Sequence, residues 1–243
     1  MRLYLTSLIS QLINSEPDAI TYAYIFEMID IFLEDTEKVK KDVKGILKDG
    51  QKENFKLELE YTTQNLEDIG VADLMQPIPV DYEKYKSKKI DQLVDKQFDK
   101  FTREIKGQLM NLINAEDASS VQNLLETYLK KEKSSQSIVN KMMRIYRTED
   151  TYMRSLVKLD IQKELLEQGI KVKRRWVHTL RVAVNEISPN YVPRDDHLAL
   201  DGVLEDNSGY FHTLLGDAKA PCMFGIPEED INCRCDVDFV LDE

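Results

Sequence analysis

The chain has 243 residues, of which 33 are lysine or arginine and 44 are aspartate or glutamate, so its formal net charge is −11. An acidic chain is repelled by nucleic-acid phosphates and by anionic lipid, which argues against nonspecific wrapping of DNA. No apolar run approaches the roughly 18 residues of a membrane span, so no membrane partner is expected. Three cysteines and no recognisable signal peptide favour a reducing compartment, such as a cytoplasm.

Residues 1–136 are predicted to form a helical arm that contacts partner proteins. Residues 75–82 contain two prolines, which exclude a helix interior and predict a loop. Apolar and polar residues nearly alternate over 55–66, as they would in a strand, but the helix-forming residues around them favour a helix. Gly50 is the expected end of one helix, and 130–136 is a polar joint. Four stretches carry apolar residues at helical spacing and are predicted helices: 2–14, 18–47, about 90–113 and 121–129.

Residues 137–243 are predicted to form a small α+β module, so the expected fold is mainly α with an α+β C-terminal part. The first element is a helix over 137–168. Its apolar residues form a stripe, and Glu149 occupies one position of that stripe. A carboxylate in an apolar stripe is unfavourable unless it finds a cation or hydrogen-bond donors. We therefore expect Glu149 either in water at the edge of the stripe, or paired with an arginine or with the rest of the module.

The remainder of the module is predicted to be short strands and turns. Alternation over 172–178 predicts a strand with Trp176 facing inward. A short helix is expected over 193–200, with Gly202 just past its end. The last strand is predicted from about 234 to 241.

All three histidines and all three cysteines of the chain lie beyond residue 175. Cys233 and Cys235 are two residues apart, so on a strand their sulfur atoms point to the same face. Two thiolates on one face could supply half of a tetrahedral zinc site, with His197 as the third ligand. The alternative is that the two thiols are small buried groups that pack in the core. Three residues are candidates for the fourth ligand: His178, His212 and Cys222.

The residues around these candidates have expected roles of their own. His197 and Asp201 are four apart on the predicted helix, so they could form a pair that orients the imidazole, or a structural hydrogen bond. Asn232 is expected in the turn before the last strand. Arg234 should face away from the cysteines, where it can hold a carboxylate or backbone carbonyls. No catalytic residue is predicted, since the chain has no Gly-rich phosphate loop, Gly-x-Ser-x-Gly or His-Glu-x-x-His motif.

The order of these motifs resembles the phage head morphogenesis family, the minor head proteins similar to the F protein of phage Mu. The resemblance covers roughly residues 137–241. The family often has Asp-x-Arg-x-Arg between the tryptophan and the histidine, and the corresponding residues 185–196 lack it. Four features carry the resemblance: Arg147-Thr148-Glu149, Trp176 after a basic strand, His197-x3-Asp201-Gly202, and Asn232-Cys233-Arg234-Cys235.

The resemblance implies a minor capsid protein of a tailed phage, made in the host cytoplasm and carried in the virion at the portal vertex. Its expected partners are the portal protein and other phage head proteins, and it could influence DNA packaging or ejection. Contact with phage DNA is disfavoured by the acidic charge, although the basic run 171–175 offers a local patch. The resemblance implies no catalytic activity. Two alternatives remain: a zinc-dependent hydrolase, and a toxin or effector module that uses the His/Cys cluster.

Overall fold

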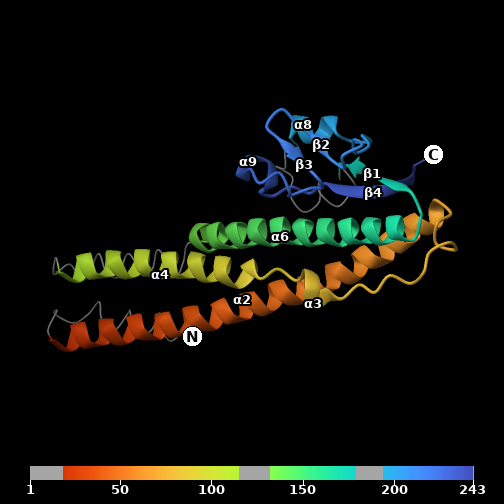
Figure 1. The fold of residues 1–243 in the computed structure, drawn as a ribbon. Helices are drawn as coiled ribbons and strands as arrows, with labels where there is room; N and C mark the ends of the chain where they lie inside the picture. The colour runs from red at the N-terminus through yellow and green to blue at the C-terminus, as the bar shows by residue number, and fades with distance from the viewer. Residues whose placement is uncertain (1–18, 115–131, 179–193, 243) are drawn as a thin grey trace. The chain divides into compact units, whose positions relative to one another are not determined.

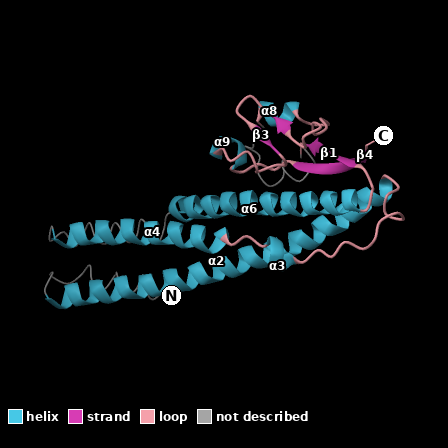
Figure 2. Ribbon diagram, in the orientation of Figure 1, coloured by secondary structure: helices cyan, strands magenta, loops and turns pink. Residues whose placement is uncertain are grey.

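The computed structural model describes residues 19–114, 132–178 and 194–242 (Figure 1). The described chain is mainly helical, with two small sheets near the C-terminus (Figure 2), as the sequence predicts. No described helix is both long and apolar enough to cross a membrane. The helices expected over 2–14 and 121–129 lie outside the described residues.

The helices and strands have the following bounds. The helices are α2 (Ala19–Asp68), α3 (Tyr82–Tyr85), α4 (Lys89–Asn114), α6 (Glu132–Glu167), α8 (Asp195–Ala199) and α9 (Pro227–Asp230). The strands are β1 (Val172–Val177), β2 (Phe211–His212), β3 (Asp217–Ala218) and β4 (Asp236–Leu241). Strand β1 pairs with β4, and β2 pairs with β3, both antiparallel.

The chain divides into two compact units, which are described separately. Unit 1 contains residues 1–46 and 91–142, and unit 2 contains residues 47–90 and 143–243. The expected functional division between an arm and a module at residue 137 stays a prediction.

Unit 1 joins the first part of α2 to α4 through charged and apolar contacts. Lys40 and Lys44 of α2 lie 3.3 and 2.7 Å from the Asp95 carboxylate of α4. Phe98 and Ile105 of α4 are buried, roughly one and three helical turns beyond Asp95. The predicted amphipathic helix near residues 90–113 is therefore confirmed, and its apolar side is buried.

Helix α2 runs through Gly50, so the prediction that a helix ends there is wrong. A Cβ atom at Gly50 would lie 2.9 Å from the hydroxyl oxygen of Tyr146, so the missing side chain makes room for the neighbouring helix α6. The helix ends at Asp68 instead, where Gly70 has a φ of +73°. A left-handed glycine is a common helix terminator. Residues 55–66 are helical, as the helix-forming context favours.

Of two other predicted boundaries, one is confirmed and the other is partly wrong. The proline-bearing segment stays non-helical until Asp81, which caps α3 by accepting a hydrogen bond of 3.0 Å from the backbone N–H of Glu83. This part of the prediction is confirmed. The polar joint is partly wrong, because α6 already begins at Glu132. Polar side chains without proline or glycine allow a helix to continue.

Glu149 is buried, although neither of its two expected settings is found. Its carboxylate accepts a hydrogen bond of 2.5 Å from the hydroxyl of Ser87, which precedes α4. Among the residues that the structure describes, its partner is therefore a hydroxyl and not an arginine. The donor comes from a residue 62 positions earlier, which helical spacing alone does not reveal.

Unit 2 has two apolar cores, and β1 and β4 contribute to both. Figure 1 shows β1 and β4 lying alongside α6. Trp176 of β1 is fully buried and lies opposite Val237 of β4, which confirms the inward tryptophan. The first core consists of Phe55, Leu66, Val71, Tyr85, Met153, Val157, Ile161, Leu165, Val172 and Phe239. The second consists of Trp176, Leu200, Phe211, Cys222, Cys233, Cys235 and Val237.

Arg174 of β1 also points inward, and a buried ion pair compensates its charge. Its guanidinium contacts the Glu205 carboxylate and the Lys219 carbonyl, and it donates to the Gly209 carbonyl at 3.0 Å. Glu205 accepts a second hydrogen bond of 2.9 Å from the backbone N–H of Arg174. The pair therefore ties β1 to the loop that follows α8.

Replacing Glu205 with glutamine should lower the free energy of unfolding by about 2 kcal/mol, the scale of one buried hydrogen bond to a charged group. Glutamine keeps the size but leaves the Arg174 charge without its carboxylate, while the two carbonyls still accept from it. Urea unfolding followed by circular dichroism measures the change. Glu228→Gln, at an exposed position, is the matched control and should change stability by less than about 0.5 kcal/mol.

Candidate functional site

His197, Cys233 and Cys235 converge in the second core of unit 2. The Nδ1 atom of His197 lies 3.5 Å from the Cys233 sulfur and 3.6 Å from the Cys235 sulfur. The three residues are at most 2% exposed, and their ligand atoms form one of the described groups that could hold a metal ion. We call these three residues the His–Cys cluster. The two cysteines reach the same side although β4 begins only at Asp236, so the expected strand start at residue 234 is wrong.

Glu229 fixes the orientation of the His197 ring. The Nε2 atom of His197 lies 2.6 Å from a carboxylate oxygen of Glu229, which is itself fully buried. A carboxylate accepts a hydrogen bond from Nε2–H, which leaves Nδ1 facing the two sulfur atoms. Glu229 lies in α9, where Pro227 occupies the first turn and favours a helix start. A carboxylate that orients a ligating histidine is a recurrent feature of metal sites.

The thiols and the imidazole shift one another's pKa values. Hydrogen bonds from the Cys222 and Cys235 thiols hold the pKa of Cys233 well below its usual value. The same hydrogen bonds to Cys233, together with burial, raise the pKa of Cys222 and of Cys235. Burial alone would lower the pKa of His197, but its hydrogen bonds to Cys233 and Glu229 raise it. Negative charge therefore concentrates on the Cys233 sulfur, next to the imidazole.

The three candidates for a fourth ligand lie in different settings. His212 is exposed and hydrogen-bonded to Asp206 and Asp217, at 3.1 and 2.7 Å. His178 is buried, and its Nδ1 atom has no hydrogen-bond partner in the described part of the chain. Cys222 is buried, its S–H donates to the Asp230 carbonyl at 3.2 Å, and its sulfur interacts with that of Cys233. Of the three, the contact with a cluster thiol favours Cys222.

Aromatic rings surround the His–Cys cluster. Trp176 meets the His197 ring edge to face, with ring centroids 5.5 Å apart. Phe224 stacks on the His197 ring, with centroids 5.5 Å apart and 24° between the planes. Phe211 packs against Trp176 at 5.1 Å. These apolar walls exclude water from the thiols, which is typical of a closed site.

Asp201 does not orient the His197 ring, and it makes a structural hydrogen bond at the turn after α8, which is the second of the two alternatives. The Asp201 carboxylate accepts a hydrogen bond of 2.7 Å from the backbone N–H of His178. Helix α8 ends at Ala199, so helical spacing no longer applies at residue 201. Gly202 has a φ of +80° and donates from its backbone N–H to the Trp176 carbonyl at 2.8 Å, so the Asp201–Gly202 turn ties α8 to β1.

The remaining motif residues join the Asn-Cys-Arg-Cys segment to α6. Arg147 donates to the Asn232 side-chain oxygen at 3.5 Å, and the backbone N–H of Asn232 donates to the Thr148 hydroxyl at 2.8 Å. Asn232 has a φ of +61°, as expected for a turn residue. Burial lowers the pKa of Arg147, and the nearby charge of Arg234 adds to the effect. The acceptors expected for Arg234 stay a prediction.

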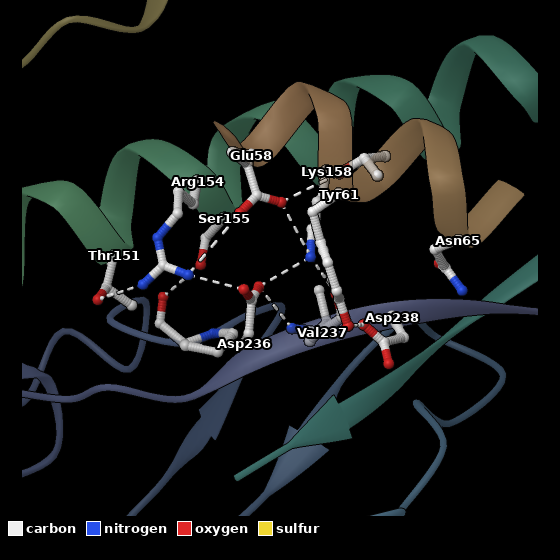
Figure 3. Close-up of polar contacts among 12 residues, drawn as sticks. Glu58, Tyr61, Asn65, Thr151, Arg154, Ser155, Lys158, Asp236, Val237 and Asp238 are labelled. Carbon is white, nitrogen blue, oxygen red and sulfur yellow. Dashed lines mark hydrogen bonds and ion pairs between the residues drawn. The ribbon is translucent and has the colours of Figure 1, made fainter. Parts of the chain in front are cut away.

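A buried group of charges lies next to the His–Cys cluster in sequence, and sequence analysis did not find it. Asp236 directly follows Cys235. Its carboxylate lies 2.9 Å from the Lys158 ammonium and 2.7 Å from the Arg154 guanidinium, and both cations belong to α6. Lys158 also lies 3.0 Å from the Glu58 carboxylate of α2 (Figure 3). We call Glu58, Arg154, Lys158 and Asp236 the ion-pair cluster. Its members come from three segments that lie far apart in the sequence. The spacing of Arg154 and Lys158, which are four residues apart on α6, also suits an exposed helix face.

The carboxylates of this cluster differ in their pKa values. Burial and the charge of Asp236 raise the pKa of Glu58, and they outweigh the two neighbouring cations. For Asp236, burial acts in the same direction, but the charges of Lys158 and Arg154 outweigh it and lower the pKa. Lys158 keeps a raised pKa despite its burial, because two carboxylates surround it. Lys158 is therefore a permanent cation, and it is not suited to act as a base at neutral pH.

An open pocket of about 360 Å³ adjoins the ion-pair cluster. It mixes carboxylates and a guanidinium with apolar side chains and an amide. The lining residues are Asn54, Leu57, Glu58, Tyr61, Asp150, Arg154, Val177 and Asp236.

The basic run 171–175, the patch considered for DNA contact, is largely engaged within the chain. Lys173 lies 3.3 Å from the Asp242 carboxylate, and Arg175 lies 3.4 Å from that of Asp238. Arg174 is held by Glu205, as described above.

Comparisons with known proteins find that part of the chain is similar to part of an enzyme. No family model matches the chain, and no solved structure matches it. Over 100 residues, the chain is 34% identical to the NAD(+)–arginine ADP-ribosyltransferase EFV of Enterococcus faecalis (strain ATCC 700802 / V583). The matched stretch is 41% of this chain, and the chain spans only 19% of that protein.

These findings correct the identification drawn from the sequence motifs. No phage head family is found, and the similar protein is named as an ADP-ribosyltransferase, so the expected minor capsid protein without catalytic activity is wrong. The portal and head-protein partners and the virion location were expected on the same grounds, and neither the structure nor the similarity tests them. Of the functions considered from the sequence, the similarity favours the toxin or effector module.

Proposed function

We propose that this chain is part of a toxin- or effector-type enzyme related to NAD(+)–arginine ADP-ribosyltransferases, and that Zn²⁺ bound to the His–Cys cluster holds its C-terminal module together. The similarity over 100 residues supports the enzymatic part. The convergence of one imidazole and two thiols in a buried site supports the zinc part, and it is the geometrical observation that carries the proposal.

The spacing of the three side chains suits zinc. A tetrahedral ion with Zn–S bonds of about 2.3 Å and Zn–N bonds of about 2.0–2.1 Å holds nitrogen and sulfur ligands roughly 3.6 Å apart. The separations of His197 from Cys233 and Cys235 are 3.5 and 3.6 Å. Both nitrogen–sulfur separations therefore match those that the ion requires, and all three ligand atoms lie within 4.8 Å of one another.

The surroundings favour a structural site over a catalytic one. A catalytic zinc keeps an open position for water, whereas a structural zinc has four protein ligands. The His–Cys cluster is buried beside aromatic rings, and the Cys222 sulfur interacts with that of Cys233. We assign Cys222 as the fourth ligand, and Glu229 as the carboxylate that orients His197.

Elemental analysis of protein purified without chelator tests the zinc site. One zinc per chain is expected, and His197→Ala and Cys235→Ser should each lose it. His212→Ala is the control and should keep the full amount, because this exposed ring lies outside the cluster. Loss of zinc in Cys222→Ser but not in His178→Ala supports the assigned fourth ligand, and the reverse result reassigns it. A parent protein without zinc contradicts the site.

The enzymatic part predicts transfer of ADP-ribose to an arginine side chain. In such a reaction the bond between nicotinamide and the ribose C1′ atom breaks, and a bond forms between C1′ and a guanidinium nitrogen. Nicotinamide leaves with the electron pair of the broken bond, and the guanidinium releases one proton. The products are thus ADP-ribosyl-arginine, nicotinamide and H⁺.

Incubation with NAD⁺ labelled in its ADP-ribose part tests this reaction. We expect label on an arginine-containing peptide, nicotinamide in equal amount, and no label on the same peptide with lysine in place of arginine. Absence of label from both peptides contradicts the enzymatic proposal for this chain, whatever the zinc content.

A further inference from the structure

The three cysteines of the chain are all free, and all three are buried in the second core of unit 2. Under the proposed function, one zinc ion binds all of them as thiolates. Two sulfur ligands of a tetrahedral zinc with Zn–S bonds of about 2.3 Å lie roughly 3.8 Å apart. A small movement is then enough to join two of the sulfur atoms, and a joined pair no longer supplies thiolates to the ion. The arrangement that favours zinc therefore also favours oxidation of the thiols.

Cys222 and Cys233 are the pair that can be joined with least strain. Cys233 and Cys235 are separated by one residue, and a disulfide between such close positions strains its geometry. Cys222 and Cys233 lie eleven positions apart in the sequence, so the chain between them can adjust. They also meet at one atom, because the Cys222 thiol and the Cys233 backbone N–H both donate to the Asp230 carbonyl oxygen, each at 3.2 Å. Their two sulfur atoms interact as well.

Cys222 is the thiol that a small oxidant meets first. It is 5% exposed, whereas Cys233 and Cys235 are 1% and 2% exposed. Its backbone has a φ of +62°, a left-handed conformation that is uncommon outside glycine. Such a conformation persists where the surrounding structure fixes it, and it is frequent at functional sites. The loop between β3 and α9 therefore holds this thiol in place against its backbone preference.

We propose that Cys222 and Cys233 form a reversible disulfide when a peroxide oxidises the chain, and that this reaction expels the zinc ion. The inference rests on the zinc part of the proposed function and adds the regulation of that site. After the reaction the ion keeps only His197 and Cys235, whereas a structural zinc site needs four protein ligands. The module thus has a metal cross-link under reducing conditions and a disulfide cross-link under oxidising ones.

The two sulfur atoms supply the two electrons that reduce the peroxide. The Cys222 thiolate attacks one oxygen of hydrogen peroxide, so an S–O bond forms, the O–O bond breaks and hydroxide leaves. The Cys233 thiolate then attacks the Cys222 sulfur, so the S–S bond forms and a second hydroxide leaves. Two protons from solvent convert the hydroxides to water. The products are one disulfide, two water molecules and free Zn²⁺.

Treatment of the zinc-bound parent with hydrogen peroxide tests the proposal. A zinc indicator should record the loss of one zinc per chain. Titration of the unfolded product with a thiol reagent should show that the free thiols fall from three to one. A phosphine reductant should then restore all three thiols and the binding of added zinc. Oxidation to sulfinic acid would be irreversible under this reductant, so recovery identifies a disulfide.

Mass spectrometry identifies which cysteines are joined, because the sequence allows them to be separated. Cleavage after Lys219, Glu229 and Arg234 places each of the three cysteines in a different peptide. The peptide that contains Cys222 should be linked to the one that contains Cys233, and the third should keep its free thiol. This measurement uses the unaltered chain, so it decides the proposal whatever any variant does to folding.

Cys222→Asp distinguishes disulfide formation from other routes of zinc loss. Aspartate can bind zinc through a carboxylate oxygen and tolerates a left-handed backbone, but it cannot form a disulfide. The variant should bind zinc and should release it at least tenfold more slowly than the parent at the same peroxide concentration. His212→Ala is the control outside the cluster, and it should release zinc at the rate of the parent.

The outcomes separate this inference from the proposed function. Zinc that stays bound while all three thiols remain free overturns the inference and leaves the zinc site intact. A disulfide that includes Cys235, or zinc release from Cys222→Asp as fast as from the parent, also overturns it. A parent purified without zinc contradicts the zinc part of the proposed function, and with it the expulsion of the ion. The peptide map of that same protein still tests the disulfide on its own.

Discussion

Replacing Cys233 with serine should remove zinc from the chain and lower the free energy of unfolding of unit 2 by about 4 kcal/mol. This is the stabilisation that a ligand gives at a free concentration about 1,000-fold above its Kd. Cys233 is the central thiol of the cluster, since it meets His197, Cys222 and Cys235. Serine preserves the size of the side chain but supplies no thiolate, so the other ligands are left without their common partner.

Thermal unfolding and amide hydrogen exchange measure this effect. A loss of 4 kcal/mol corresponds to roughly 8–16 °C in Tm for a chain of this size. Protection should fall first around Phe211 and Val237, which pack in the same core as the cluster. Protection around Phe98 of unit 1 should change less, because that residue belongs to the other compact unit.

Two further variants show whether zinc causes the stabilisation. Glu229→Gln keeps all four assigned ligands, so it should still bind one zinc, with an affinity about 10–100-fold lower. His212→Ala should match the parent in zinc content and in Tm. If Cys233→Ser retains zinc, or loses zinc without a change in Tm, the metal does not hold this module together.

The sequence predicts the parts of this fold that depend on local patterns. The apolar spacing of α4 and α6 and the alternation of β1 each lie within one segment, so they identify the elements correctly. The inward position of Trp176 follows from the same alternation. The grouping of His197 with two cysteines could also be proposed, because histidines and cysteines are rare in this chain and gather near its end.

The parts that the sequence did not predict depend on contacts between distant segments. Glu229 is one of 44 acidic residues, and only its contact with the His197 ring distinguishes it. Arg154 and Lys158 are four apart on α6, a spacing that is also common on exposed helix faces. Their burial depends on Asp236, 78 positions beyond Lys158. Gly50 resembles a helix terminator until the neighbouring Tyr146 is seen.

The two polar sites of unit 2 are joined through adjacent residues. Cys235 belongs to the His–Cys cluster, and Asp236 is the centre of the ion-pair cluster. A metal that holds Cys235 therefore also restricts where the Asp236 carboxylate can lie against α6. Since Asp236 lines the pocket, zinc binding at the His–Cys cluster should help to fix the pocket wall.

Replacing Lys158 with methionine should lower the free energy of unfolding by about 3–5 kcal/mol, the usual effect of removing one partner from a buried group of charges. The Lys158 side chain is 1% exposed, and its ammonium group lies 3.0 Å from Glu58 and 2.9 Å from Asp236. It also donates to the Val237 carbonyl. Methionine fills a similar volume but supplies no charge, so both carboxylates lose their shared cation.

Lys163→Met is the matched control for this variant. Lys163 lies on the same helix, but its side chain is 70% exposed and pairs with Glu167 at 3.4 Å. An exposed pair of this kind contributes about 0.5 kcal/mol or less. Urea unfolding of the parent and the two variants compares the buried and the exposed lysine directly. Similar small losses in both variants would falsify the stabilising role of the ion-pair cluster.

The pH dependence identifies the unpaired carboxylates as the cause. Without Lys158, the folded-state pKa values of Glu58 and Asp236 should rise above those of the unfolded chain, since burial already raises the pKa of Glu58. A carboxyl group with a raised folded-state pKa takes up a proton on folding. Stability therefore increases as the pH falls through the folded-state pKa toward the pKa of the unfolded chain. The stability difference between Lys158→Met and the parent should therefore be largest near pH 7, and it should narrow at about pH 5.5. A difference that stays constant between these pH values would instead indicate lost packing, because packing does not depend on protonation.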